Sequence, residues 1–159
     1  MDAGKSKRAY DLGRLILDLS DLSDAEVEAV GRKYYEESML DIAFKGIRQT
    51  HDGQEVHFWK HRFDHSCFVS PDKVLIDIGR IARLPWVLPI IAGNIAGTEC
   101  RSKQNIDRPD NRVYICIPEN FVIWLEPRDE GGWRYSTHYP ADRTEIRLIQ
   151  RNSKKIWSF

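Results

Sequence analysis

Three short segments rich in β-branched and aromatic residues follow one another near the C-terminus, and they constrain the fold more than any other feature. They read RVYICI (112–117), NFVIWLEP (120–127) and WRYSTHY (133–139). Pro-Glu-Asn joins the first two, and Asp-Glu-Gly-Gly joins the second and third. Short strand-like segments separated by turn residues predict an antiparallel meander.

Two further segments near the C-terminus bear on the size of this sheet. EIRLIQ (145–150) is a candidate for a last strand. Residues 154–159 form either a tail or a sheet edge packed by Trp157. Residues 93–112, GNIAGTECRSKQNIDRPDNR, are predicted to form a polar loop.

Helical signals come earlier in the chain. Ser23 and Glu26 match a capping box, and apolar residues then recur at helical spacing, which predicts a helix over about 24–46. A second helix is expected after Ser70-Pro71-Asp72, with proline in its first turn. Pro85 is expected to end or kink that helix.

Helices followed by antiparallel strands predict an α+β fold, with N-terminal helices packed on a four- to five-stranded antiparallel sheet. The length of 159 residues suits one domain with spare residues at its N-terminus. We therefore expect an N-terminal helical extension over residues 1–50 and an α+β domain over 51–159.

Residues 55–70 carry three histidines, His57, His61 and His65, at a spacing of four. The segment EVHFWKHRFDHSCFVS is dominated by residues with high β-propensity, which predicts a strand. On a strand these histidines would spread over about 26 Å, at about 3.3 Å per residue, so one metal ion could not bind all three. On a helix they would stack on one face, and a metal-binding protein stays a lesser alternative.

Composition is that of an ordinary soluble globular protein, with 42% hydrophobic and 30% charged residues. Lys plus Arg and Asp plus Glu both number 24, so the net charge is zero. A protein that binds polyanions non-specifically is usually basic overall, so any role with nucleic acid requires a local patch. Residues 101–159 carry a net charge of +3, from 11 basic and 8 acidic residues.

Cysteine usage and the apolar segments predict a cytoplasmic location. Cys67, Cys100 and Cys116 contain no CxxC pair, which favours buried thiols in a reducing compartment. The N-terminus lacks the apolar region of a signal peptide. The longest apolar stretch, LPWVLPIIAG, is too short and too rich in proline to span a membrane.

Three groups of side chains could carry chemistry. His65, in RFDHSCF, is able to exchange a proton near neutral pH, although a single histidine is more often structural. Arg80 and Arg83 lie three apart on the expected helix and could hold a phosphate together, or form an ordinary solvated helix face. Thr137 and Tyr139 alternate on the last strand, so their hydroxyl groups share a side while His138 points to the other.

Together these groups suit metal-independent RNA cleavage. That reaction needs a base for the 2′-hydroxyl, an acid for the departing 5′-oxygen, and positive charge beside the phosphate. The sequence contains no carboxylate cluster typical of a two-metal nuclease and no GxxxxGK[ST] or GxGxxG motif. Cys67 lacks the context of a thiol protease. We therefore expect no cofactor and no metal.

The order of these motifs resembles the phage-borne branch of the barnase–EndoU–colicin–RelE-like nuclease superfamily. The resemblance covers about residues 55–150, and rests on RFDHSCF, RIARLPW (Arg80–Trp86), NFVIWLEP and the T-x-Y-P of Thr137–Pro140. It departs from the family pattern at His138, where a small residue is expected, and in the long polar segment around 92–112. Residues 1–50 lie outside it.

The resemblance implies a metal-independent endoribonuclease of the toxin or effector type, encoded by a bacterium or phage. It implies His65, Arg80, Arg83, Thr137 and Tyr139 as catalytic residues, with acid–base chemistry by His65 and Tyr139. Tyrosine and tryptophan rings stack on unpaired bases, and arginines contact phosphates. The candidate RNA-binding residues are Arg62, Arg134, Arg143, Trp133 and Tyr135.

The expected partners are tRNA or mRNA, without a preference for DNA, together with an immunity or antitoxin protein. The alternative is a non-catalytic, phage-associated binding or structural module of the same fold. Zero net charge and the N-terminal helix motivate that alternative.

Overall fold

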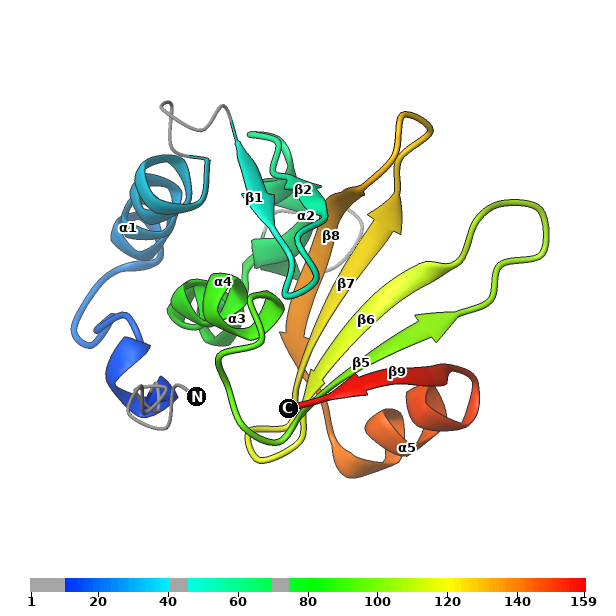
Figure 1. Ribbon diagram of the computed structural model, residues 1–159. Helices are drawn as coiled ribbons and strands as arrows, with labels where there is room; N and C mark the ends of the chain where they lie inside the picture. The colour runs from blue at the N-terminus through cyan, green and yellow to red at the C-terminus, as the bar shows by residue number, and fades with distance from the viewer. Residues whose placement is uncertain (1–10, 41–45, 70–74) are drawn as a thin grey trace, which may run out of the picture.

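A seven-stranded sheet forms the centre of the computed structural model, which describes residues 11–40, 46–69 and 75–159 (Figure 1). The strand order is β1-β2-β8-β7-β6-β5-β9. The strands are β1 (Ile47–Gln49), β2 (Glu55–His57), β5 (Thr98–Lys103), β6 (Asn111–Cys116), β7 (Phe121–Pro127), β8 (Trp133–Pro140) and β9 (Lys154–Ser158). A separate two-stranded sheet pairs β3 (Phe68–Val69) with β4 (Leu75–Ile76).

Most helices are short. They are the 3-10 helices η1 (Leu12–Leu15) and η4 (Leu84–Trp86), the π-helix η2 (Tyr35–Leu40), and the α-helices α1 (Asp24–Tyr34), α2 (Arg62–Cys67), α3 (Ile78–Ala82), α4 (Val87–Ile91) and α5 (Arg143–Arg151). No helix among the described residues has both the length and the apolar character needed to cross a membrane.

The predicted meander is confirmed, because β6, β7 and β8 are antiparallel neighbours. The α+β class is also confirmed, but the expected sheet of four or five antiparallel strands is wrong. The sheet has seven strands and is mixed, because β2 runs parallel to β8. The β1–β2 hairpin extends one edge of the meander, and β5 and β9 extend the other.

Two predictions for the C-terminal half are wrong for physical reasons. EIRLIQ lies in helix α5: Asp142 caps the helix by accepting a hydrogen bond from the backbone of Glu145, and Ile146 and Ile149 form its buried side. Part of the expected polar loop is strand β5. Its first residues alternate between buried and partly exposed positions, so a strand accommodates their polar side chains. The final residues form the edge strand β9, one of the two alternatives that the sequence left open.

The strand expected over residues 55–70 is found only near its ends, in β2 and β3, and is wrong between them, where the chain forms helix α2. The helical period explains α2. Phe63 and Cys67, four residues apart, are buried in the core, while Arg62 and Ser66 contact strand β8.

The two helices expected from capping signals are partly recovered. The first begins at Asp24 after its Ser23 capping box, and continues from α1 into η2 as far as Leu40. The second was expected to begin at residues 70–72, which lie outside the described residues. Leu75 and Ile76, expected on that helix, form strand β4, and α3 begins after its cap, Asp77.

The two faces of the sheet are covered differently (Figure 1). Helices α1 to α4 pack on one face, where the main core contains residues as far apart in sequence as Val27, Tyr35, Phe63, Ile90 and Tyr135. On the other face a smaller cluster joins α5 to the sheet, and it contains Val113, Ile115, Val122, Ala141, Ile146 and Ile149. The three cysteines are buried and free, as predicted.

Candidate functional site

A β-bulge in strand β8 decides which side chains face the core. Tyr135 pairs with Leu125, and Thr137 pairs with Trp124, so Ser136 is an extra residue between the two pairs. As a result Tyr135 and His138 are both buried in the main core. Thr137 and Tyr139 point to the opposite face, as the alternation in the sequence predicted.

His138 anchors strand β8 to helix α3. Its Nε2 lies 2.8 Å from the backbone oxygen of Arg80, and its Nδ1 bonds the hydroxyl of Tyr135. A carbonyl oxygen only accepts, so Nε2 carries the proton and Nδ1 accepts from Tyr135. Burial lowers the pKa of His138 to about 4, which keeps the ring neutral at physiological pH. This contact fixes Arg80 beside the strand.

Arg80 and Tyr139 form the first contact of the candidate site. The Arg80 guanidinium carbon lies 5.3 Å from the centroid of the Tyr139 ring, within the range of a cation–π interaction. The same guanidinium contacts the carboxylate of Asp77 at 3.3 Å and the backbone oxygen of Ser66 at 3.5 Å. Arg80 therefore joins α3, α2 and β8 at one point.

The hydroxyl of Tyr139 is held in place by Trp124, whose Nε1 donates a hydrogen bond to it at 2.8 Å. Burial raises the pKa of Tyr139, and the nearby Glu145 carboxylate acts in the same direction. The phenol is therefore protonated at neutral pH and able to donate. Thr137 lies opposite Trp124 in the strand pairing.

A second group of polar residues surrounds Glu126, the penultimate residue of β7. Its carboxylate accepts hydrogen bonds from Arg62 at 3.1 Å, Arg134 at 2.9 Å and Ser136 at 2.9 Å. Burial pushes the pKa of Glu126 up, but the hydrogen bonds from Arg134 and Ser136 outweigh it, and the pKa lies below its usual range. Two guanidinium groups thus share one ionised carboxylate, which leaves one excess positive charge.

His65 lies on helix α2, the helix that also carries Arg62. His65 is exposed, and its neighbour Ser66 donates a hydrogen bond to the backbone oxygen of Ser136 at 3.2 Å. The ring of His61, one turn earlier, lies 6.1 Å from that of His65. His57 is separate from both, on β2, where its Nε2 lies 2.7 Å from Arg128. No three His, Cys, Asp or Glu side chains of the described residues are grouped to hold a metal ion.

Several residues predicted for the site lie elsewhere. Arg83 follows the end of α3, and its guanidinium turns back to the oxygen of Gly79 and over the ring of Trp86. Tyr135 is fully buried and offers no surface for stacking. Trp133 donates a hydrogen bond to Gln54.

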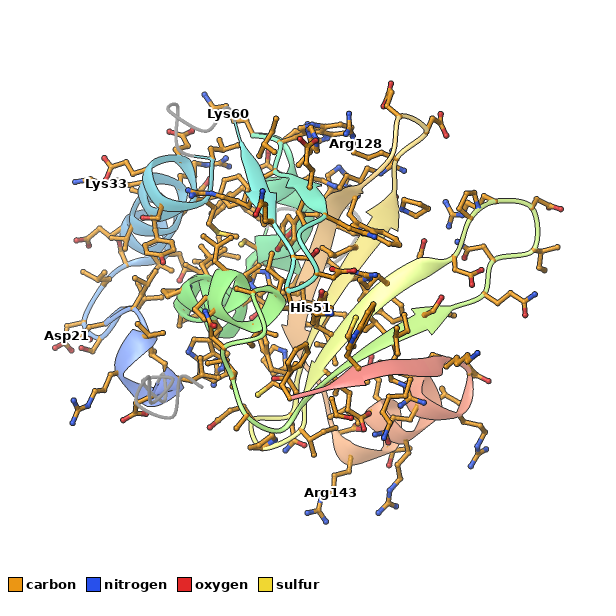
Figure 2. The ribbon with its side chains drawn as sticks, viewed as in Figure 1. Asp21, Lys33, His51, Lys60, Arg128 and Arg143 are labelled. Carbon is orange, nitrogen blue, oxygen red and sulfur yellow. The ribbon has the colours of Figure 1, made fainter. Side chains whose placement is uncertain are left out.

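Arg143 begins helix α5, and its side chain points away from the sheet (Figure 2). The structure thus brings Arg80 and Tyr139 into contact, and places Thr137 on the same face of β8. Arg62 and Arg134 meet at Glu126, beside the bulge in the same strand.

A pocket of about 430 Å³ adjoins the Glu126 group at the β7–β8 hairpin. Trp59 lines it with an exposed fraction of 40%, and the guanidinium carbon of Arg134 lies 6.0 Å from the Trp59 ring. Arg108 and Arg128 also line this pocket, together with Asp129 and Glu130. An aromatic ring beside several cations suits an unpaired base and its phosphate.

Sequence reasoning missed Glu126 and Ser136. A signal for Glu126 was present, because it is the only charged residue in NFVIWLEP. The hairpin register pairs it with Arg134. Ser136 gave no comparable signal, since its role depends on the bulge.

No protein-family model matches the chain, and neither a curated protein nor a solved structure matches it significantly.

Proposed function

We propose that this protein is a metal-independent endoribonuclease whose site lies on strands β7 and β8. One observation carries the proposal: Arg80 contacts the ring of Tyr139, and the arginines around Glu126 lie four residues further along the same pair of strands, about 13 Å away. The resemblance to the barnase–EndoU–colicin–RelE-like superfamily points to the same chemistry.

The arginines supply the positive charge that the reaction requires. Negative charge grows on the phosphate as the 2′-oxygen attacks phosphorus, and fixed guanidinium groups stabilise it. Arg62 and Arg134 exceed Glu126 by one charge, and Glu126 holds both side chains in place. Arg80 adds a further cation next to Tyr139.

His65 and Tyr139 supply the proton transfers. The exposed imidazole of His65 takes the proton of the 2′-hydroxyl as the new P–O bond forms. The phenol of Tyr139 donates a proton to the 5′-oxygen as the old P–O bond breaks. Burial raises the pKa of Tyr139, so the phenol carries its proton at neutral pH. Thr137 contributes a hydroxyl group beside the phosphate.

The test is cleavage of total RNA and of purified tRNA in excess EDTA. Wild type should cleave, His65→Ala should abolish cleavage, and Tyr139→Phe should reduce it strongly. His61→Ala is the matched control, because His61 is the residue just before α2, four residues from His65, and the proposed chemistry does not use it. Failure of a folded wild type to cleave any RNA in EDTA would contradict the proposal.

One observation favours a second candidate, a non-catalytic, phage-associated binding or structural module of the same fold. The cations of the site already have carboxylate partners, since Arg62 and Arg134 share Glu126 and Arg80 contacts Asp77. Such a network also serves as a purely structural surface. Binding of a protein partner without cleavage of any RNA would favour this candidate.

A further inference from the structure

Helix α5 and the strand after it carry a row of basic side chains that the β7–β8 site does not use. Five cations lie within 13 residues, and all five are exposed: Arg143, Arg147, Arg151, Lys154 and Lys155. None of them forms an ion pair with any residue that the structure describes. Because the net charge of the chain is zero, these unpaired cations make this part of the surface locally positive.

The row is ordered along one side of the helix. Arg143, Arg147 and Arg151 recur every four residues, so they lie on the same side and span about 12 Å. That length covers about three phosphates of one nucleic-acid strand, at about 3.4 Å each. Figure 2 shows Arg143 at the lower edge of the molecule, pointing into solvent.

Helix stability explains Arg151, which lies in the last turn of α5 where a cation is favourable, but it does not explain Arg143. Arg143 is the first residue of α5, next to the positive end of the helix dipole, where a cation is unfavourable. The acidic residue of the first turn, Glu145, interacts instead with Tyr139. Arg143 is therefore better explained by an external anion than by the helix itself.

A groove beside the row gives the anion a place to bind. It has a volume of about 370 Å³ and lies between α5 and the turn that joins β6 to β7. Arg143, Arg147, Asn120 and Gln150 line it together with Ile117, Pro118 and Ile146, and no acidic residue lines it. Guanidinium and amide groups are the donors that proteins use to contact phosphate oxygens.

We propose that this α5 surface, the row of arginines and lysines with its groove, binds the sugar–phosphate backbone of RNA. A membrane does not fit, because Ile146 and Ile149 are buried against the sheet and Leu148 is the only exposed apolar residue of α5. A protein partner fits less well, because Ile117 and Leu148 are the only exposed large apolar residues among the residues of α5 and of the groove lining, and stable protein interfaces have a larger apolar core. The choice of RNA over DNA rests on the proposed function, and it makes the substrate a folded RNA large enough to reach a second surface.

The experiment measures binding of a 2′-O-methyl RNA hairpin, which cannot be cleaved through its 2′-oxygen, by fluorescence anisotropy over a range of KCl concentrations. Arg143→Gln/Arg147→Gln should weaken binding by about tenfold and flatten the slope of log K against log salt by about 2. The matched control is Arg14→Gln/Lys33→Gln. This control also removes two positive charges, from η1 and α1. It should change the affinity for the RNA hairpin by less than about twofold, because distant exposed charges are screened by salt. Lys33 lies on the opposite side of the molecule from Arg143 (Figure 2).

The outcomes separate this inference from the nuclease proposal. Loss of binding in the α5 variant alone supports the α5 surface, even if wild type cleaves no RNA. Equal affinities of both variants and wild type would overturn it, even if wild type cleaves RNA in EDTA. A DNA hairpin that binds as tightly, with the same loss in the α5 variant, would overturn the assignment to RNA.

Discussion

The guanidinium of Arg80 lies over the ring of Tyr139, with 5.3 Å between the guanidinium carbon and the ring centroid. Two further contacts maintain this arrangement: Asp77 pairs with the Arg80 side chain, and His138 donates a hydrogen bond to the Arg80 backbone. Helix α3 is thereby fixed against β8 through both the backbone and the side chain of one residue.

This contact predicts that Arg80 and Arg83 differ in function, although both were expected to hold the phosphate. We expect Arg80→Gln to lower kcat/KM for RNA cleavage by about 100-fold or more, because it removes a positive charge that stabilises the negatively charged transition state. Arg83→Gln should change it by less than about threefold, because Arg83 lies over Trp86 and away from Tyr139. Steady-state cleavage assays on both variants test this, and equal losses would contradict it. Thermal unfolding of both variants checks that any loss is not due to misfolding.

Glu126 is expected to contribute to stability through its ionised form. Glu126→Gln leaves Arg62 and Arg134 without a counter-charge, and because these side chains keep partial contact with water we expect a loss of about 1–2 kcal/mol at pH 7. The pKa of Glu126 is depressed in the folded state, so its stabilisation is present above the ordinary glutamate pKa of about 4.3 and is lost as pH falls through the lower folded value.

Urea unfolding of wild type and Glu126→Gln at pH 7 and at successively lower pH measures this difference. The two free energies of unfolding should converge as pH falls through the folded pKa of Glu126. Glu130→Gln is the control, because Glu130 is a glutamate on the β7–β8 hairpin whose side chain is 78% exposed and should contribute little. A gap between wild type and Glu126→Gln that does not depend on pH would show that the carboxylate charge is not the source of stability.

Patterns within single short segments were enough to predict the meander and helix α1. The meander was predictable from apolar segments and turn residues, and α1 from its capping box. The strand predicted around His61 failed because β-propensity is overridden when a helix buries Phe63 and Cys67 together. The β1–β2 and β5–β6 pairings are local hairpins, but the pairings of β2 with β8 and of β5 with β9 join distant segments, which local patterns do not reveal.

The site residues likewise divide into those that local alternation predicts and those that depend on contacts with distant segments. Alternation along β8 correctly placed Thr137 and Tyr139 opposite His138. Glu126 was missed because its importance depends on Arg62, which reaches it from a distant helix. Tyr135 was assigned to RNA binding because the bulge at Ser136, which turns both Tyr135 and His138 inward, leaves no mark in the sequence.

His138 predicts a loss of stability at mildly acidic pH. Its pKa falls from an unfolded value of about 6.5 to about 4 when buried. A depressed pKa means that the stabilisation is complete above the unfolded value and is lost as pH falls from about 6.5 to about 4. The slope reaches about 1.4 kcal/mol per pH unit for one proton. Burial also lowers the pKa of His51, so part of the slope comes from that residue.

Urea unfolding of wild type, His138→Gln and His51→Gln between pH 6.5 and pH 4 separates the two contributions. We expect His138→Gln to be less stable than wild type at pH 7, because it disturbs a buried hydrogen-bonded ring. Its stability should nevertheless fall less steeply with acid, and His51→Gln should flatten the curve to a smaller extent. An unchanged slope in His138→Gln would mean that this histidine is not the group that takes up the proton.

Trp59 is expected to set the preference for unpaired RNA. Stacking of a base on an aromatic ring contributes about 1–3 kcal/mol, so Trp59→Leu should raise KM for single-stranded RNA by about tenfold or more. The change in kcat should be smaller, because the Trp59 pocket adjoins the Glu126 group and lies apart from the Arg80–Tyr139 contact. The backbone oxygen of Trp59 accepts a hydrogen bond from Tyr35, and the substitution leaves this bond intact.

Trp157→Leu is the matched control, since Trp157 has the same exposed fraction of 40% but lies on edge strand β9. An unchanged KM in Trp59→Leu, or an equal rise of KM in Trp157→Leu, would show that no base stacks on Trp59 in this pocket.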